Sequence, residues 1–87
     1  MDNEEPLHFY VEDPQITFTR NLNRIVRLYL ERNNISMKEF YHRMAASGLI
    51  NTMTFDFYRR GERWPQAVPL RGLCEFLGIP VEMLFRR

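Results

Sequence analysis

The stretch from Asn51 to Pro65, "NTMTFDFYRRGERWP", decides the fold that we predict for this chain. Asn51 is a residue type that caps helix N-termini, whereas Gly61 and Pro65 are typical of a helix end. At about 100° per residue, Phe55 and Tyr58 lie on one side of this helix. The other side carries four groups of mixed character: Met53, Asp56, Phe57 and Arg60. A short helix with large apolar groups on both faces is therefore expected.

Two further helices precede this stretch. The first has the apolar stripe Leu22, Ile25, Val26, Tyr29 and Leu30, with Arg20, Arg24, Arg27 and Arg32 on its other faces. The second begins at "SMKE", where Ser36 can cap the helix while Glu39 reaches back to the cap's amide. Its apolar stripe is Met37, Phe40, Tyr41 and Met44. Gly48 is expected to end the helix in the left-handed conformation.

Two helices follow the stretch. The fourth helix carries the apolar stripe Leu70, Leu73, Cys74 and Leu77 and is expected to end at Gly78. Pro80 suits the first position of a last short helix that carries Met83, Leu84 and Phe85. Residues 20–87 are therefore predicted to form one all-α domain of five short helices.

Residues 1–19 are predicted to form a separate acidic arm. Its segments "LHFYVE" and "QITFT" are β-prone and flank Asp13-Pro14, a turn-favouring pair. The arm is either a solubilising tail or an extended strand or hairpin. As a strand it would pair with a second subunit through Phe9, Tyr10 and Val11. Met83 and Phe85 near the other end are the alternative dimer surface.

The net charge of +1 conceals an uneven distribution. Residues 1–19 carry five acids and no Lys or Arg, whereas residues 20–87 carry all twelve bases against six acids. Eleven of the bases are arginines, whose planar fork suits phosphate. Two interpretations are open: a polyanion partner, or an ordinary solvated surface. Within the cluster Arg59, Arg60 and Arg63, phosphate contact is the favoured one.

Several classes of function are not expected. His8 and His42 have no neighbouring ligands, and we find no nucleophile–base grouping or Gly-rich phosphate loop. We expect no metal, no cofactor and no enzymatic activity. The single Cys74 reads as a small buried hydrophobe. The N-terminus lacks a signal peptide and no apolar run could span a membrane, so a cytoplasmic location is expected.

The order of these parts resembles the Cro and phage-repressor type of helix-turn-helix domain, also called the xenobiotic-response-element type. The likeness covers roughly residues 18–85. It includes a capped second helix, a third helix ending in basic residues and Gly, a following Pro, and the closing residues Leu77, Gly78, Ile79 and Leu84. The resemblance implies five helices, sequence-specific binding of double-stranded DNA, dimerisation, and action as a transcriptional regulator.

The resemblance also implies site residues. Asn51 would cap the recognition helix, and Thr52, Met53 and Phe57 would face base edges. Asp56 on that face would orient Arg60, accept a hydrogen bond from cytosine, or be merely solvated. Phosphate contacts would come from the helix end at Ser36 and Met37 and from basic or amide groups: Arg59, Arg60, Arg63 and Gln66.

Three departures from the family pattern affect this interpretation. The segment from Phe40 to Phe55 is about one turn longer, so either the second helix is extended or the turn is lengthened. The usual ion pair between the first and third helices is missing, because Leu30 and Arg59 hold the nearest positions. Base-reading faces normally offer polar groups, whereas Met53 and Phe57 offer apolar ones.

Two hypotheses follow for the function. The first is a small sequence-specific DNA-binding transcriptional regulator, expected to be a repressor of the kind that phages and mobile elements encode, which binds an operator as a homodimer. In the second the same fold binds a protein through the apolar Met53/Phe57 face, as an antirepressor, antitoxin-like protein or inhibitor does. For Phe57 itself, burial in a rotated core is the alternative to contact with DNA or a partner. Trp64 is either a packing anchor or a contact to the DNA backbone.

Overall fold

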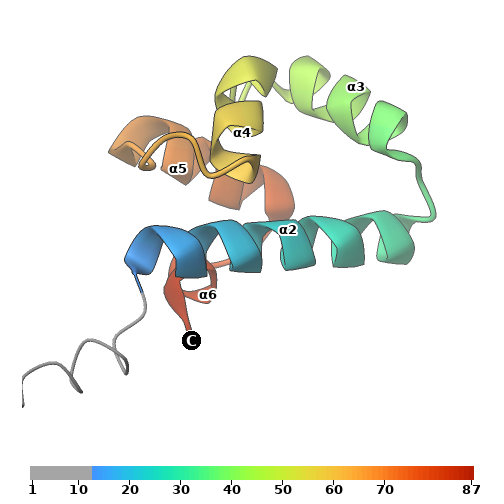
Figure 1. Cartoon of the computed structure of the whole chain (residues 1–87). Coiled ribbons are helices and arrows are strands. Elements are labelled where there is room, and N and C mark those ends of the chain that lie inside the picture. The colour runs from blue at the N-terminus through green and yellow to red at the C-terminus, as the bar shows by residue number, and fades with distance from the viewer. Residues whose placement is uncertain (1–12) are drawn as a thin grey trace, which may run out of the picture.

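The computed structural model describes residues 13–87, which form five helices and no strand, confirming the all-α prediction over that range. Figure 1 labels them α2 to α6: α2 Pro14–Asn33, α3 Met37–Ser47, α4 Thr52–Arg59, α5 Ala67–Leu77 and α6 Glu82–Phe85. None of these helices combines the length and the apolar character needed to cross a membrane.

The start of α2 corrects the sequence prediction. Asp13 is the N-cap, its side chain accepting from the Gln15 amide at 2.9 Å, and Pro14 occupies the first turn. Aspartate at the cap and proline behind it favour a helix start as well as a turn. The segment "QITFT" is therefore helical and not β, and the domain boundary near Thr19 is wrong. The remainder of the predicted arm, including "LHFYVE", lies outside the described residues.

The caps of α3 and α4 agree with their prediction. Ser36 Oγ accepts from the Glu39 amide at 3.1 Å, and Asn51 Oδ1 accepts from the amides of Met53 and Thr54 at 2.7 and 3.3 Å. Gly48 and Gly78 end α3 and α5 in the left-handed conformation. The Glu39 side chain differs from the expected capping box: its carboxylate lies 3.3 Å from Arg43 Nε.

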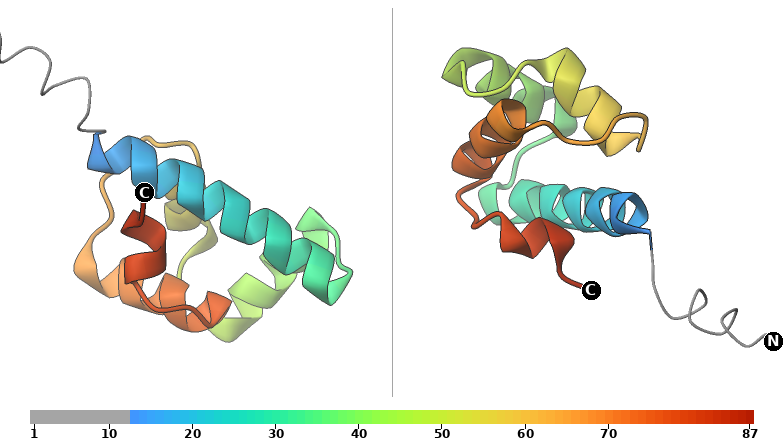
Figure 2. Two further views of the ribbon diagram at one scale, coloured as in Figure 1. Left: turned by 90° about the horizontal axis from the view of Figure 1, so that it is seen from below. Right: turned by 90° about the vertical axis from the view of Figure 1, so that its left-hand side faces the viewer.

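Helix α2 lies between two layers, as the two views of Figure 2 show. Helices α3, α4 and α5 lie on one side of α2, and α6 lies on the other. Side chains from all five helices and from the α3–α4 loop form one core: Phe18, Leu22, Ile25, Val26, Phe40, Met44, Ile50, Phe55, Tyr58, Leu73, Cys74, Leu77 and Leu84. Burial disfavours the thiolate of Cys74 and raises the pKa of its thiol.

Between Phe40 and Phe55, α3 continues to Ser47, and a four-residue loop, residues 48–51, then leads to α4. That loop packs directly on α5. A Cβ added to Gly72 would come within 1.8 Å of the Leu49 carbonyl oxygen, so no larger residue fits there. Helix α5 therefore packs closely on the loop that directly precedes α4.

Candidate nucleic-acid interface

Helix α2 holds the C-terminal end of α4 by amide side chains. Asn23 Nδ2 donates to the carbonyl of Arg59 at 3.0 Å and to that of Thr19 at 2.9 Å. Gln15 Nε2 donates to the carbonyl of Gly61 at 3.1 Å. The carbonyl of Arg59, the last residue of α4, has no partner within that helix, so the Asn23 amide satisfies a group that would otherwise need water, and Gln15 binds the chain just beyond the helix end. They also set the end of α4 against α2.

The inner face of α4 is packed among aromatic rings. Phe55 is fully buried, and its ring centroid lies 5.5 Å from that of Phe40 and 5.7 Å from that of Tyr41. Tyr58 is 1% exposed and meets Phe18 edge-on at 5.8 Å. Edge-to-face and tilted ring pairs at such distances are favourable beyond their burial. The predicted inner positions of α4 are confirmed.

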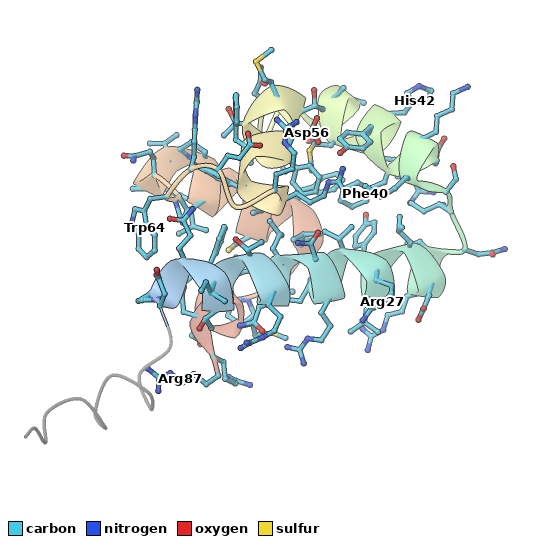
Figure 3. All side chains as sticks on the ribbon, viewed as in Figure 1. Arg27, Phe40, His42, Asp56, Trp64 and Arg87 are labelled. Atoms are coloured by element: carbon cyan, nitrogen blue, oxygen red, sulfur yellow. The ribbon has the colours of Figure 1, made fainter. Side chains whose placement is uncertain are left out.

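The outer face of α4 remains open to solvent. Met53 is 66% exposed, and Thr52 and Phe57 are half-buried. The alternative in which a rotated core buries Phe57 is therefore contradicted. Figure 3 places Asp56, on the same helix, on the side of the molecule away from Arg27 and Arg87.

Phe57 supports two guanidinium groups. The Arg63 Cζ atom lies 3.8 Å from the centroid of the Phe57 ring, and that of Arg60 lies 5.5 Å from it. A cation over an aromatic face is attracted by the ring quadrupole, by about 0.5–1 kcal/mol at exposed sites. The ring thus holds two exposed arginines beside the outer face of α4, and their guanidinium groups in turn cover part of its apolar surface.

Asp56 is engaged by groups other than Arg60. The Tyr41 hydroxyl donates a hydrogen bond to Asp56 Oδ1, and Arg59 Nε lies 3.9 Å from the same oxygen. Of the three alternatives for Asp56, the orientation of Arg60 is contradicted, because Arg60 Nη2 lies 3.4 Å from Glu62 Oε1 instead. Arg59 is likewise not free, since it has the Asp56 carboxylate as an ionic partner. These contacts join α3 to α4 through polar side chains.

The same contact perturbs Tyr41. Partial burial disfavours its phenolate form, and the hydrogen bond to Asp56 stabilises the neutral hydroxyl, so the pKa of Tyr41 is raised above its ordinary value. Arg59 acts in the opposite direction but more weakly than burial does. The neutral Tyr41 hydroxyl is thus the stable donor to Asp56.

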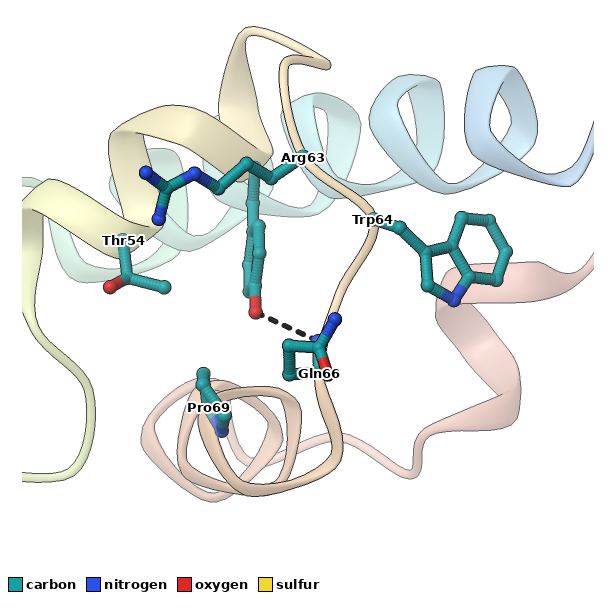
Figure 4. Close-up of a pocket in the computed structure, with 6 residues that line it drawn as sticks. Thr54, Arg63, Trp64, Gln66 and Pro69 are labelled. Carbon is teal, nitrogen blue, oxygen red and sulfur yellow. Dashed lines mark hydrogen bonds between the residues drawn. The ribbon is translucent and has the colours of Figure 1, made fainter.

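A shallow pocket of about 340 Å³ lies between α4 and the start of α5. Thr54, Arg63 and Gln66 line it together with Tyr58, and Figure 4 shows these three around the opening. The Tyr58 hydroxyl accepts from the backbone amide of Gln66 at 2.9 Å, which fixes the α5 end of the pocket. A hydroxyl, a guanidinium and an amide around one opening are groups that bind phosphate oxygens.

The other predicted contact residues lie in varied settings. Ser36 and Met37 are at the end of α3 remote from α4; the Ser36 hydroxyl is used by the cap, and Met37 packs partly on the core. Trp64 is 48% exposed, with its ring 6.1 Å from that of Phe85. Phe85 itself stacks on Phe18 at 5.4 Å. Phe85 is therefore largely an internal contact, and Met83 is half-buried.

Four contributions were missed by sequence reasoning: the amides of Gln15 and Asn23, the Tyr41 hydroxyl, and Thr54. The first three form hydrogen bonds between segments distant in sequence, and Thr54 lines a pocket that two helices share; spacing along one helix gives no signal for either. The predicted arm residues Phe9, Tyr10 and Val11 lie outside the described residues.

Comparison of the chain with protein-family models, with curated proteins and with solved structures gives no match.

Proposed function

We propose that the chain is a DNA-binding transcriptional regulator of the Cro and phage-repressor-like helix-turn-helix type, acting in the cytoplasm as a homodimer and most simply as a repressor. The observation that carries the proposal is the outer face of α4. It is exposed at Met53, and two arginines are held on the ring of Phe57 beside it. A helix of this exposure fits the major groove, while guanidiniums at its end reach the phosphates.

The contacts divide into two kinds. Met53 and Thr52 would meet base edges, with the Met53 thioether packing on thymine methyl groups. Phe57 would act chiefly by holding Arg60 and Arg63 for phosphate contact. Asp56, hydrogen-bonded by the Tyr41 hydroxyl and with Arg59 3.9 Å from the same oxygen, would fix α4 on α3 instead of contacting the duplex. In a dimer of the usual geometry the half-sites would be about 34 Å apart.

The salt dependence of binding tests this assignment. Binding of duplex DNA by the full chain and by the double variant Arg60→Ala, Arg63→Ala is measured by fluorescence anisotropy over a series of salt concentrations. Each lost phosphate contact should flatten the slope of log K against log salt by about 0.9, so the loss of both arginines should flatten it by about 1.8 per bound subunit and by about 3.6 for a dimer. The control variant Arg27→Ala, Arg32→Ala loses the same charge from exposed positions on α2. Equal slopes for the two variants contradict the proposal.

A second candidate function is supported by the exposure of Met53. Exposed apolar side chains on a helix can be covered by a partner protein, as in an antirepressor, antitoxin-like protein or inhibitor. Elution of the chain from a random-DNA column well below physiological salt, with the Arg60/Arg63 variant eluting at the same point, would favour this function over DNA binding.

A further inference from the structure

The shallow pocket between α4 and the start of α5 contains hydrogen-bond donors that the fold leaves unused. It is lined by six residues, none of which is Asp or Glu within the part of the chain that the structure describes: Thr54, Tyr58, Arg63, Trp64, Gln66 and Pro69. Its volume of about 340 Å³ lies at the lower end of the range of small-molecule sites. The proposed function uses Arg63 at the DNA surface but gives the pocket itself no role.

Arg63 differs from its two neighbours in the basic cluster. Arg59 and Arg60 each form an ion pair, whereas no carboxylate pairs with Arg63 in the described part of the chain. The Cζ atom of Arg63 lies 3.8 Å from the centroid of the Phe57 ring, so the guanidinium is held by its face and its N–H edges remain able to donate. In Figure 4 this group extends toward Thr54. A positioned cation with no acid beside it favours an anion in the pocket.

The most buried residue of the pocket offers a further donor. Tyr58 is 1% exposed, and its hydroxyl oxygen accepts from the Gln66 amide at 2.9 Å. The hydroxyl proton of Tyr58 has no acceptor among residues 13–87, so a group in the pocket can accept it. The side chains of Thr54 and Gln66 likewise form no hydrogen bond within that range. Because buried polar groups are normally paired, the free Tyr58 proton indicates an acceptor that a ligand supplies.

The start of α5 adds two backbone donors. Gln66 is the N-cap of this 11-residue helix but forms no side-chain cap, Pro69 has no N–H, and Leu70 is the first residue of α5 whose amide reaches a backbone carbonyl. The amides of Ala67 and Val68 are therefore unpaired in the range that the structure describes. Unpaired amides at a helix N-terminus attract anions, so they reinforce the preference of the side-chain donors.

We propose that this pocket binds the terminal phosphoryl group of a small organic phosphate. Donors on several sides match the three free oxygens of a phosphoryl group better than the two oxygens of a planar carboxylate. Tyr58, Trp64 and Pro69 supply ring surfaces against which the organic part can pack. A phosphodiester of DNA has only two free oxygens and carries a sugar on either side. It can therefore meet Arg63 at the rim, but it does not reach the buried hydroxyl of Tyr58.

Occupation of the pocket weakens DNA binding. The bound phosphoryl group takes up the N–H edges of Arg63 and brings about two negative charges close to the outer face of α4. Arg63 is then unavailable to the DNA backbone, and the duplex is repelled. The small phosphate thus acts as an effector that releases the regulator from DNA. This consequence rests on the proposed function, whereas phosphate binding by the pocket does not.

Titration of the full chain with phenyl phosphate, followed by amide NMR without DNA, tests the pocket. Phenyl phosphate is the monoester probe, and dimethyl phosphate is the diester probe. We expect saturable shifts of the Trp64 indole N–H and of the amides of Ala67 and Val68, with dimethyl phosphate binding about ten-fold more weakly. The absence of saturable shifts with phenyl phosphate, or equal affinities for the two probes, would overturn the proposal.

Two variants locate the binding. Arg63→Gln removes the charged donor and should weaken phenyl phosphate binding about ten-fold, whereas Thr54→Val keeps the side-chain shape without the hydroxyl and should weaken it about two- to five-fold. Arg71→Gln is the matched control, because Arg71 is exposed on α5 and does not line the pocket. The amide spectrum of each variant shows that it is folded. If Arg63→Gln binds phenyl phosphate as well as Arg71→Gln does, the pocket is not the site.

A final titration adds duplex DNA. Phenyl phosphate should lower the DNA affinity of the unaltered chain more than sodium chloride of the same ionic strength does, and Arg63→Gln should abolish that difference. A chain that binds phenyl phosphate but no DNA contradicts the regulator function and leaves the pocket assignment standing. DNA binding that phenyl phosphate changes no more than the matched salt does would overturn the effector role.

Discussion

The two faces of α4 use the same residue type for different purposes. Phe55, on the inner face, is fully buried and meets other aromatic rings. Phe57, two positions later, is half-buried and meets guanidinium groups. An apolar side chain on a helix thus does not by itself indicate the core. The neighbours supplied by other elements decide whether it holds the fold or holds the charged groups of a binding surface.

The largest expected difference between the faces is in stability. Phe55→Ala removes a ring from the packed core and should lower the free energy of unfolding by about 3–5 kcal/mol. Phe57→Ala removes a ring that is open to solvent on one side and should cost about 1 kcal/mol or less. Chemical denaturation of the two variants measures both. Equal losses would show that the two faces are not distinct.

The inner face can be probed next through its polar support. Asn23→Ala removes the donor to the carbonyls of Arg59 and Thr19 and should lower the free energy of unfolding by about 1–2 kcal/mol. Asn33→Ala is the matched control, because Asn33 Nδ2 donates only to the exposed carbonyl of Tyr29 in the same helix. If Asn23→Ala lowers the free energy of unfolding no more than Asn33→Ala does, the Asn23 amide does not hold α4 against α2.

The role of the outer face can be tested by replacing the ring of Phe57. Phe57→Leu keeps an apolar side chain but abolishes the ring that attracts Arg60 and Arg63, whereas Phe57→Tyr keeps the ring. We expect two- to five-fold weaker DNA binding for the leucine variant, from a loss of about 0.5–1 kcal/mol, and little change for tyrosine. If leucine and tyrosine behave alike in anisotropy titrations, the ring does not position the arginines.

The smallest predicted effect concerns the contact between α3 and α4. Because the pKa of Tyr41 is raised in the folded protein, its contribution to stability is complete below the ordinary tyrosine pKa of about 10. That contribution is lost as the pH rises through the higher folded value. Tyr41→Phe should therefore lose less stability than the unaltered chain as the pH rises above about 10. The free energy of unfolding of both proteins, measured by chemical denaturation at several pH values, tests this prediction. An equal loss of stability in the two proteins over that range would contradict it.

Sequence reasoning predicted the fold where local signals agree with packing. The caps Ser36 and Asn51, the stops Gly48 and Gly78, and the apolar stripes are each encoded within a few residues. The start of α2 was missed because "QITFT" is locally β-prone. Burial of Phe18 against Tyr58 and Phe85, which are distant in sequence, accompanies its helical conformation in the fold.

The candidate site was predictable only in part. The two faces of α4 follow from the helical period alone, and the basic residues at its end are contiguous in sequence. The partner of Asp56 was not predictable, because spacing within one helix suggests Arg60 whereas the actual donor, Tyr41, lies on α3. The stacking of Arg63 on Phe57 depends on the path of the chain after Gly61, which no periodicity describes.

The most direct test of the central claim follows the methyl groups of the methionines by NMR during titration with duplex DNA bearing selected binding sites. Met53, exposed on the outer face of α4, and Met83, in α6 on the other side of α2, report on opposite sides of the molecule. The account predicts that the Met53 methyl resonance shifts on binding while that of Met83 does not. A shift at Met83 with Met53 unchanged would contradict it.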